Sequence, residues 1–113
     1  ARRDLLADIQ QVLASGELAE AQRAVSAVHA SGAVVDYVLR LATATRQNEP
    51  CGTGLSPRAT LALLAAARAW AWLGGRDYLI PEDVQAVLPA VAGHRLGGDG
   101  AQIRRLLDEV PVL

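Results

Sequence analysis

The residues best suited to binding a ligand follow one another at the start of the longest apolar segment of the chain. Ser56 is followed directly by Pro57 and Arg58. A serine hydroxyl accepts hydrogen bonds from the backbone N–H groups of a first helical turn, and proline suits the first helical position. The pattern therefore predicts a helix that begins at Pro57 with Ser56 as its N-cap residue.

Arg58 would lie in the first turn of this helix, where local electrostatics favour an acidic residue. The N-terminus of a helix carries roughly half a positive charge, so a cation there costs about 0.3–1 kcal/mol unless an anion is nearby. Free backbone N–H groups, the helix dipole and the guanidinium would together attract a phosphate. An ordinary surface salt bridge would also explain an arginine at this position. The neighbouring motifs must therefore decide between phosphate binding and a salt bridge.

Composition limits the classes of protein to which the chain can belong. Its 113 residues suit one small domain with a core of its own, and its high alanine content favours closely packed helices. The net charge is −1 and every basic side chain is arginine, with no lysine at all. We therefore expect no general attraction to nucleic acid or to acidic lipid.

Few residues suggest a disulfide, a metal site or a membrane segment. Cys51 is the sole cysteine, and His29 and His94 lie too far apart in sequence for a metal-ligand pattern. The apolar run that Arg68 interrupts is shorter than the ~20 residues that cross a bilayer, and no signal-like segment opens the chain. We expect a cytoplasmic protein with no bound metal and no membrane insertion.

Hydrophobic spacing and helix-capping residues predict an all-α fold. The expected helices cover about residues 5–13, 15–25, 31–46, 57–73 and 81–95, with a last helix that ends before Pro111. Some extended residues around His29 connect the second helix to the third, Ser31 caps the third, and residues 47–55 form a loop. Gly74 and Gly75 end the helix of residues 57–73, and Pro89 is expected to bend or divide the helix that follows.

Three expectations concern packing. The stripe of the third helix that faces inward comprises Val34, Val35, Val38, Leu39, Leu41, Ala42 and Thr45. The helix from Pro57 to Leu73 is apolar on nearly every side and should be the buried centre of the bundle, with Trp70 and Trp72 packing against different neighbours. Arg76 and Asp77 should form a turn pair with structural hydrogen bonds, in preference to contacting another subunit.

From Ser31 onward, the order of these features resembles the helical lid of MoxR-type AAA+ ATPases. The segment from Gly54 to Ala59 resembles the sensor-2 motif of the family. The other matching segments are Thr45-Arg46, Gly75-Arg76-Asp77-Tyr78, Pro81-Glu82-Asp83-Val84 and His94-Arg95. Ile80 departs from the pattern, since the family commonly has a threonine cap there.

The resemblance implies a small helical bundle of the AAA+ lid type with about four to six helices. Residues 1–30 would be an N-terminal helical segment and residues 31–113 the lid itself. Arg58 would be the sensor-2 arginine that approaches the phosphates of ATP, with Ser56 and Ala59 beside it. Arg46 is a weaker candidate for nucleotide contact, because a favourable position at the C-terminus of its own helix also explains it.

Because the chain has no lysine, such a lid would lack the P-loop of an ATPase. A P-loop needs a lysine on the β- and γ-phosphates, and no strand ending in paired acids is present to hold Mg²⁺. We therefore expect a fragment of a longer ATPase with no catalytic activity of its own. ATP and Mg²⁺ would belong to the full-length parent, and this chain would bind neither tightly alone.

The resemblance also implies partners: the ATPase core of the same polypeptide, neighbouring subunits of a ring that is often hexameric, and a von Willebrand factor A domain protein. The parent would remodel other proteins, as a chaperone does. Two alternatives remain. One is a free-standing α-helical module for protein–protein interaction. The other is a helix-turn-helix DNA-binding protein, against which Glu82 and Asp83 argue because they would face DNA phosphates.

Overall fold

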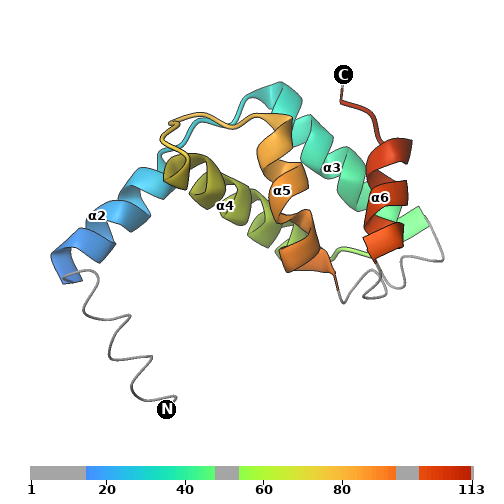
Figure 1. Cartoon of the computed structure of the whole chain (residues 1–113), viewed down its shortest axis with the longest axis horizontal. Helices are drawn as coiled ribbons and strands as arrows, with labels where there is room; N and C mark the ends of the chain where they lie inside the picture. Colours follow the sequence, from blue (N-terminus) through green and yellow to red (C-terminus); the bar gives the residue numbers. More distant parts are fainter. Residues whose placement is uncertain (1–14, 48–53, 94–99, 113) are drawn as a thin grey trace, which may run out of the picture.

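The computed structural model describes residues 15–47, 54–93 and 100–112, and all its regular elements are α-helices. Figure 1 shows α2 at one edge of the molecule and the other helices packed together beside it. The helices are α2 (Ser15–Ser26), α3 (Gly32–Gln47), α4 (Pro57–Leu73), α5 (Pro81–Ala92) and α6 (Gly100–Glu109). The predicted all-α fold is confirmed, and the first expected helix, over residues 5–13, lies outside the described residues.

The connection between α2 and α3 is extended, as expected. The His29 backbone N–H donates to the Asp77 carbonyl over 2.8 Å, and the Leu79 N–H donates to the His29 carbonyl over the same distance. This short bridge joins the segment before α3 to the segment before α5. Ser31 then caps α3, because its Oγ accepts from the Val34 N–H.

The inward face of α3 follows the predicted stripe, except that Val35 is only partly buried and that Tyr37 takes the place of Leu39. Leu39 is exposed, whereas Tyr37 is buried and its hydroxyl accepts a hydrogen bond from Gln85 of α5. The hydroxyl makes Tyr37 look like a surface residue in sequence, but a buried tyrosine needs only one polar partner for that group. Leu39 was therefore wrongly assigned to the core.

Helix α4 is the centre of the bundle, since it packs against α2, α3 and α5. Its inward face consists of Ala59, Thr60, Leu63, Ala67 and Ala71. The predicted central position is confirmed, but not all of the apolar surface of α4 is covered, because Leu61 is 68% exposed and Leu73 is 75% exposed. The inward face of α4 thus combines Leu63 with small alanines, whereas Leu61 and Leu73 lie on exposed sides of the helix.

Helices α5 and α6 complete the bundle, with α6 packing against both α3 and α5. Pro89 lies inside α5 without dividing it, and the helix continues to Ala92. The last helix ends at Glu109, before Pro111, as predicted. No helix in the described part of the chain is both long and apolar enough to span a bilayer.

Candidate functional site

The start of α4 has the predicted cap. Ser56 has an extended backbone, and its Oγ accepts a hydrogen bond from the Ala59 N–H over 3.1 Å. Pro57 occupies the first helical position. The side chain of Ala59 is buried, at 5% exposure, so both Ala59 and Ser56 serve to fix the helix start.

The cap also determines which backbone groups remain for a ligand. Proline has no N–H, the Ala59 N–H is used by Ser56 Oγ, and the Thr60 N–H donates to the Ser56 carbonyl over 2.9 Å. Among the described residues, the Arg58 N–H is then the one donor of the first turn without an acceptor. Of the free backbone N–H groups expected to attract a phosphate, the first turn thus offers that of Arg58. An anion here would be attracted mainly by the guanidinium and the dipole.

The residue before Ser56 is held to the end of α3 by both of its backbone polar groups. The Leu55 N–H donates to Thr45 Oγ1 over 2.9 Å, and Arg46 Nε donates to the Leu55 carbonyl over 2.9 Å. The side chain of Leu55 is 1% exposed and belongs to the core. We call these two hydrogen bonds the Thr45–Arg46 latch.

Gly54 brings the chain close enough for this latch. Its φ of +74° is in the left-handed region, which glycine adopts without the steric cost borne by other residues. A Cβ at this position would lie 2.9 Å from the backbone nitrogen and Cα of Arg46. The approach of this segment to α3 therefore requires glycine for its conformation and for its lack of a side chain.

Arg58 differs from the residues around it because it is exposed and has no hydrogen-bond or ion-pair partner within the described residues. The first turn of α4 contains no acidic residue. The ordinary surface salt bridge that would explain an arginine here is thus missing from the described part of the chain. Arg58 projects from a helix start whose backbone is fixed from both sides.

The four candidate residues named from sequence therefore lie together but have different structural roles. Ser56 and Ala59 form the cap, and Arg46 belongs to the latch, while Arg58 has no partner among the described residues. The hydrogen-bonding role of Thr45 is not predicted from the sequence, which indicates only a place in the apolar stripe and in the Thr45-Arg46 segment. The available signal was its hydroxyl, because a buried threonine requires hydrogen-bond partners, here the Ala42 carbonyl and the Leu55 N–H.

At the opposite end of α4, the predicted turn is present but its ion pair is not the expected one. Gly74 and Gly75 end the helix, and the Arg76 N–H donates back to the Ala71 carbonyl over 2.9 Å. The Arg76 guanidinium binds both carboxylate oxygens of Asp83, with Nη1 and Oδ2 2.7 Å apart. Asp77, the predicted partner, contributes its backbone carbonyl to His29 instead.

Asp83 explains how α5 begins without the usual capping side chain at Ile80. Its Oδ2 accepts a hydrogen bond from the Ile80 N–H over 2.9 Å, and the carboxylate is 1% exposed. The hydrogen bonds from Arg76, together with that of the Ile80 N–H and the nearby positive charge, hold the pKa of Asp83 below its ordinary value despite burial. This ion pair joins the end of α4 to the start of α5.

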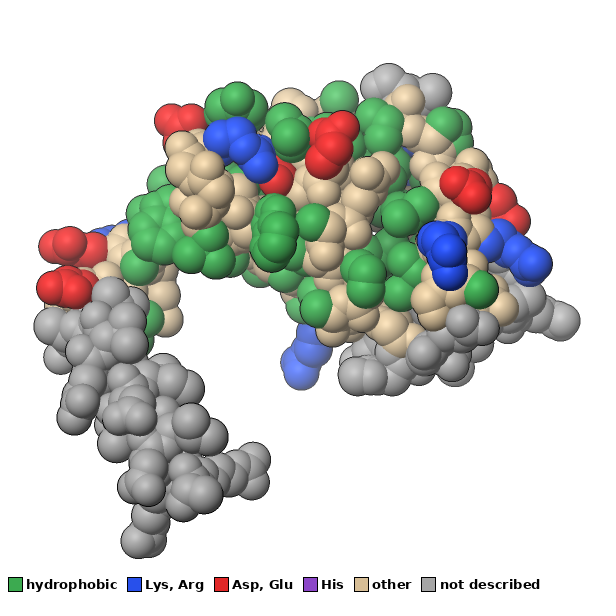
Figure 2. All heavy atoms as spheres, viewed as in Figure 1, with side chains coloured by type: hydrophobic (Ala, Val, Ile, Leu, Met, Phe, Trp, Pro, Cys, Tyr) green, Lys and Arg blue, Asp and Glu red, His purple; other side chains and the backbone are tan. Residues whose placement is uncertain are grey.

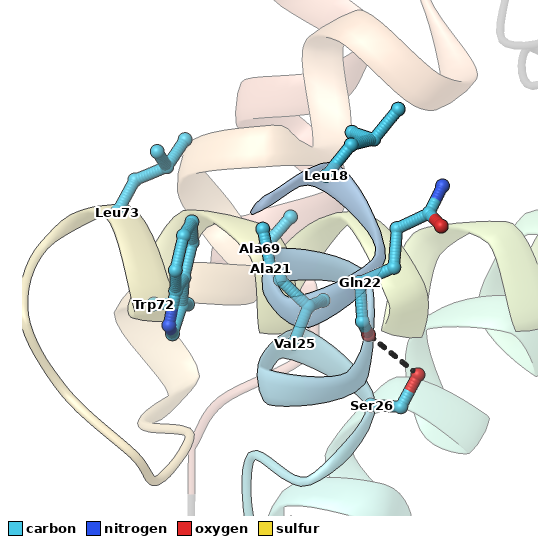
Figure 3. A pocket seen from close by; sticks show the side chains of 8 residues that line it. All are labelled: Leu18, Ala21, Gln22, Val25, Ser26, Ala69, Trp72 and Leu73. Atoms are coloured by element: carbon cyan, nitrogen blue, oxygen red, sulfur yellow. Dashed lines mark hydrogen bonds between the residues drawn. The ribbon is translucent and has the colours of Figure 1, made fainter. Parts of the chain in front are cut away.

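An apolar groove lies between α2 and α4. Leu18, Ala21 and Val25 of α2 face Ala69, Trp72 and Leu73 of α4 (Figure 3). Its volume is about 570 Å³. Figure 2 shows hydrophobic side chains gathered where the C-terminal end of α4 meets α2. Trp70 instead lies beside Gly74 and Arg76, so the two tryptophans do have different neighbours, as predicted.

Several residues considered from sequence lie outside the described residues: Cys51, His94 and Arg95. Nothing in the structure tests them. Over residues 15–47, 54–93 and 100–112, no group of three or more histidine, cysteine, aspartate or glutamate side chains is placed to hold a metal ion.

Comparisons with known proteins agree with the geometry. The AAA lid domain family model matches residues 43–110. Chaperone MoxR1 of Mycobacterium tuberculosis is 43% identical over 96 residues, covering 77% of this chain and 26% of that protein. Protein MoxR of Methylorubrum extorquens is 40% identical over 83 residues, covering 62% of this chain and 24% of that protein.

A solved structure has the same fold. The crystal structure of a candidate ATPase from Cytophaga hutchinsonii matches with a TM-score of 0.67 and 25% identity, over 80% of this chain and 33% of that one. The chain thus spans about a quarter of the length of its curated relatives and a third of the solved chain. The family match covers α4 and both of its neighbouring loops. The chain therefore belongs to the AAA lid domain family, as a lid of the MoxR type.

Proposed function

We propose that this domain is the nucleotide-sensing lid of a longer MoxR-type AAA+ ATPase, and that Arg58 is its sensor-2 arginine. The observation that carries the proposal is the exposed Arg58 guanidinium, without a partner among the described residues, on a helix start held by the cap and the latch. A terminal phosphate of ATP would neutralise a cation that the helix dipole otherwise disfavours.

The mechanism follows from the rigidity of α4. Phosphate attraction would draw Arg58 toward the nucleotide, and the fixed helix start would carry α4 with it. Because α4 packs against α2, α3 and α5, its displacement would rotate the domain as a unit. Hydrolysis would remove the terminal phosphate and release the lid. ATP and Mg²⁺ would be bound by the rest of the parent.

Substitution of Arg58 in the full-length parent tests this role. We expect Arg58→Ala to lower ATP turnover about 10-fold to 100-fold, less than the 10³–10⁵ of arginine fingers, with an unchanged melting temperature. Arg104→Ala is the matched control, since Arg104 is an exposed arginine on α6. Equal turnover of wild type, Arg58→Ala and Arg104→Ala would remove the basis of the proposal.

The apolar groove supports a second part of the proposal, which is that the ATPase core of the same polypeptide docks there. Leu73, at 75% exposure, and Trp72, at 38%, leave apolar side chains open to solvent at the end of α4, where a partner could cover them. The curated relatives are about three times as long as this chain, so such a parent has ample surface to cover the groove. Ring neighbours and a von Willebrand factor A domain protein are further proposed partners.

We further propose that the parent remodels other proteins in the cytoplasm, with lid rotation transmitting the nucleotide state. The alternative function, a free-standing interaction module, draws on the same exposed groove. Titration of this domain against a separately expressed ATPase core, with and without ATP, separates the two. Nucleotide-dependent binding supports the lid, whereas binding to an unrelated protein and none to the core supports the module.

A further inference from the structure

We infer that Thr45 and Arg46 are positioning residues that aim Arg58, and that Arg46 acts through the Leu55 backbone without touching the nucleotide. The inference rests on the proposed phosphate-sensing role of Arg58. It replaces the weak expectation that Arg46 itself contacts nucleotide.

Leu55 is attached to the end of α3 at two points. Leu55 gives its N–H to Thr45 Oγ1 and receives Arg46 Nε at its carbonyl, each over 2.9 Å. Two bonds on opposite sides of one residue fix the peptide planes before and after it. The chain therefore enters α4 in a direction set by the last turn of α3.

Only a short stretch of chain separates the latch from Arg58. Ser56 follows Leu55 directly and caps α4, and Arg58 is the second residue of that helix. Each helical residue advances the chain by only 1.5 Å, so a displacement of Leu55 reaches Arg58 almost undiminished. Arg58 has no hydrogen bond of its own within the described residues, so its aim depends on this backbone.

Thr45 and Gly54 have no access to a ligand. Thr45 is fully buried, and its hydroxyl donates to the Ala42 carbonyl over 2.6 Å while accepting from Leu55. Gly54 is also buried and lies against the backbone of Arg46. Thr45, Arg46 and Gly54 thus hold the segment that leads into α4, and that segment carries Arg58.

The test uses the full-length parent with Thr45→Val and Arg46→Met, each made alone and combined with Arg58→Ala. Thr45→Val keeps side-chain volume and charge but removes the hydroxyl. A misplacement of about 1 Å can cost on the order of 100-fold in rate, so we expect each single variant to lower ATP turnover about 10-fold to 100-fold. Thr45→Ser, which keeps the hydroxyl, should remain within about twofold of wild type.

The combined variants distinguish positioning from direct contact. If the latch acts through Arg58, then Thr45→Val and Arg46→Met change turnover less than about twofold once Arg58 is alanine. If Arg46 contacts phosphate itself, its effect multiplies with that of Arg58→Ala, and the inference is overturned. Wild-type turnover of Arg58→Ala alone would instead contradict the proposed function.

Hydrogen exchange of the Leu55 amide examines the latch independently of activity. We expect Thr45→Val to speed this exchange at least tenfold in the full-length protein, and Arg46→Met to speed it to a smaller extent, with the α5 amides unchanged. Unchanged exchange at Leu55 in both variants overturns the inference whatever the turnover shows. Equal acceleration throughout the lid also overturns it, because that result indicates general unfolding.

Discussion

The two ends of α4 each present an arginine beside a loop, and the two arginines are placed in opposite ways. Arg76, after the C-terminal end, is bound to both oxygens of the buried Asp83 carboxylate and lies 5.8 Å from the centre of the Tyr78 ring. Arg58, in the first turn, has no partner among the described residues. Its backbone is nevertheless fixed by Ser56 and by the latch.

Arg76 is thus a structural cation, and Arg58 is the cation that we propose binds a ligand. The charge of Arg76 is used within the fold, where it joins the end of α4 to the start of α5. Within the described part of the chain the charge of Arg58 has no such use, and it lies where the helix dipole makes an unaccompanied cation unfavourable. Substitutions at the Arg76 end should therefore change stability, and substitution of Arg58 should change the response to nucleotide.

The largest stability effect should come from Asp83→Asn. The variant keeps the shape of the side chain but removes the charge that binds Arg76, which we expect to lower the free energy of unfolding by about 2–3 kcal/mol. The corresponding fall in melting temperature is roughly 10 °C, measured by calorimetry. Glu82→Gln, an exposed neighbour in the same turn, should cost under about 1 kcal/mol. Equal losses would show that the ion pair has no special role.

Gly54→Ala should have the next largest effect, at the Arg58 end. The left-handed backbone costs alanine about 1–2 kcal/mol, and its Cβ would press on the backbone of Arg46. We expect a fall in unfolding free energy of at least that size in chemical denaturation. Gly16→Ala in α2 is the control, because no atom lies within 4 Å of its added Cβ. A neutral Gly54→Ala would contradict the close approach to α3.

Acid should weaken the Arg76 end more than the Arg58 end. The pKa of Asp83 is lowered in the folded state from an ordinary value of 3.8, chiefly by its hydrogen bonds with Arg76. A lowered pKa adds stability that is fully present above pH 3.8 and is lost as the pH falls through the folded value. The difference in unfolding free energy between wild type and Asp83→Asn should therefore shrink below about pH 4. A constant difference down to pH 2 would count against the ion pair.

The smallest effect on folding should come from Leu73→Ser in the apolar groove. Leu73 is largely exposed, so we expect a change in unfolding free energy of less than about 0.5 kcal/mol. Binding of the separately expressed ATPase core should weaken several-fold, as titration calorimetry can measure. Leu61→Ser, at an exposed apolar position of α4 outside the groove lining, is the matched control. If both variants bound the ATPase core with equal affinity, the groove would not be the docking site.

Much of the fold follows from local signals in the sequence. Ser31 and Ser56 mark helix starts because their hydroxyls replace missing backbone partners, and Gly75 marks the end of α4 because it adopts a positive φ of 84°. The position of Arg58 in a first turn follows from the same capping pattern. Each of these features depends on residues only a few positions apart.

The features that could not be predicted depend on contacts between distant segments. Arg76 binds Asp83 because the turn folds back onto the start of α5, and adjacency in sequence wrongly favoured Asp77. The exposure of Leu61 and Leu73 depends on which sides of α4 the other helices cover. The latch joins Thr45 and Arg46 to Leu55, about ten residues further along the chain. No hydrophobic periodicity in the intervening sequence predicts that these residues meet.

The central claim is that Arg58 couples bound nucleotide to the position of the lid, and lid closure in the full-length parent tests it most directly. Distance between a dye on α6 and a dye on the ATPase core would be measured by energy transfer with ATP and with ADP. The account predicts that wild type closes with ATP, and that Arg58→Ala loses the ATP-dependent difference at an unchanged melting temperature. Full closure of Arg58→Ala with ATP would contradict it.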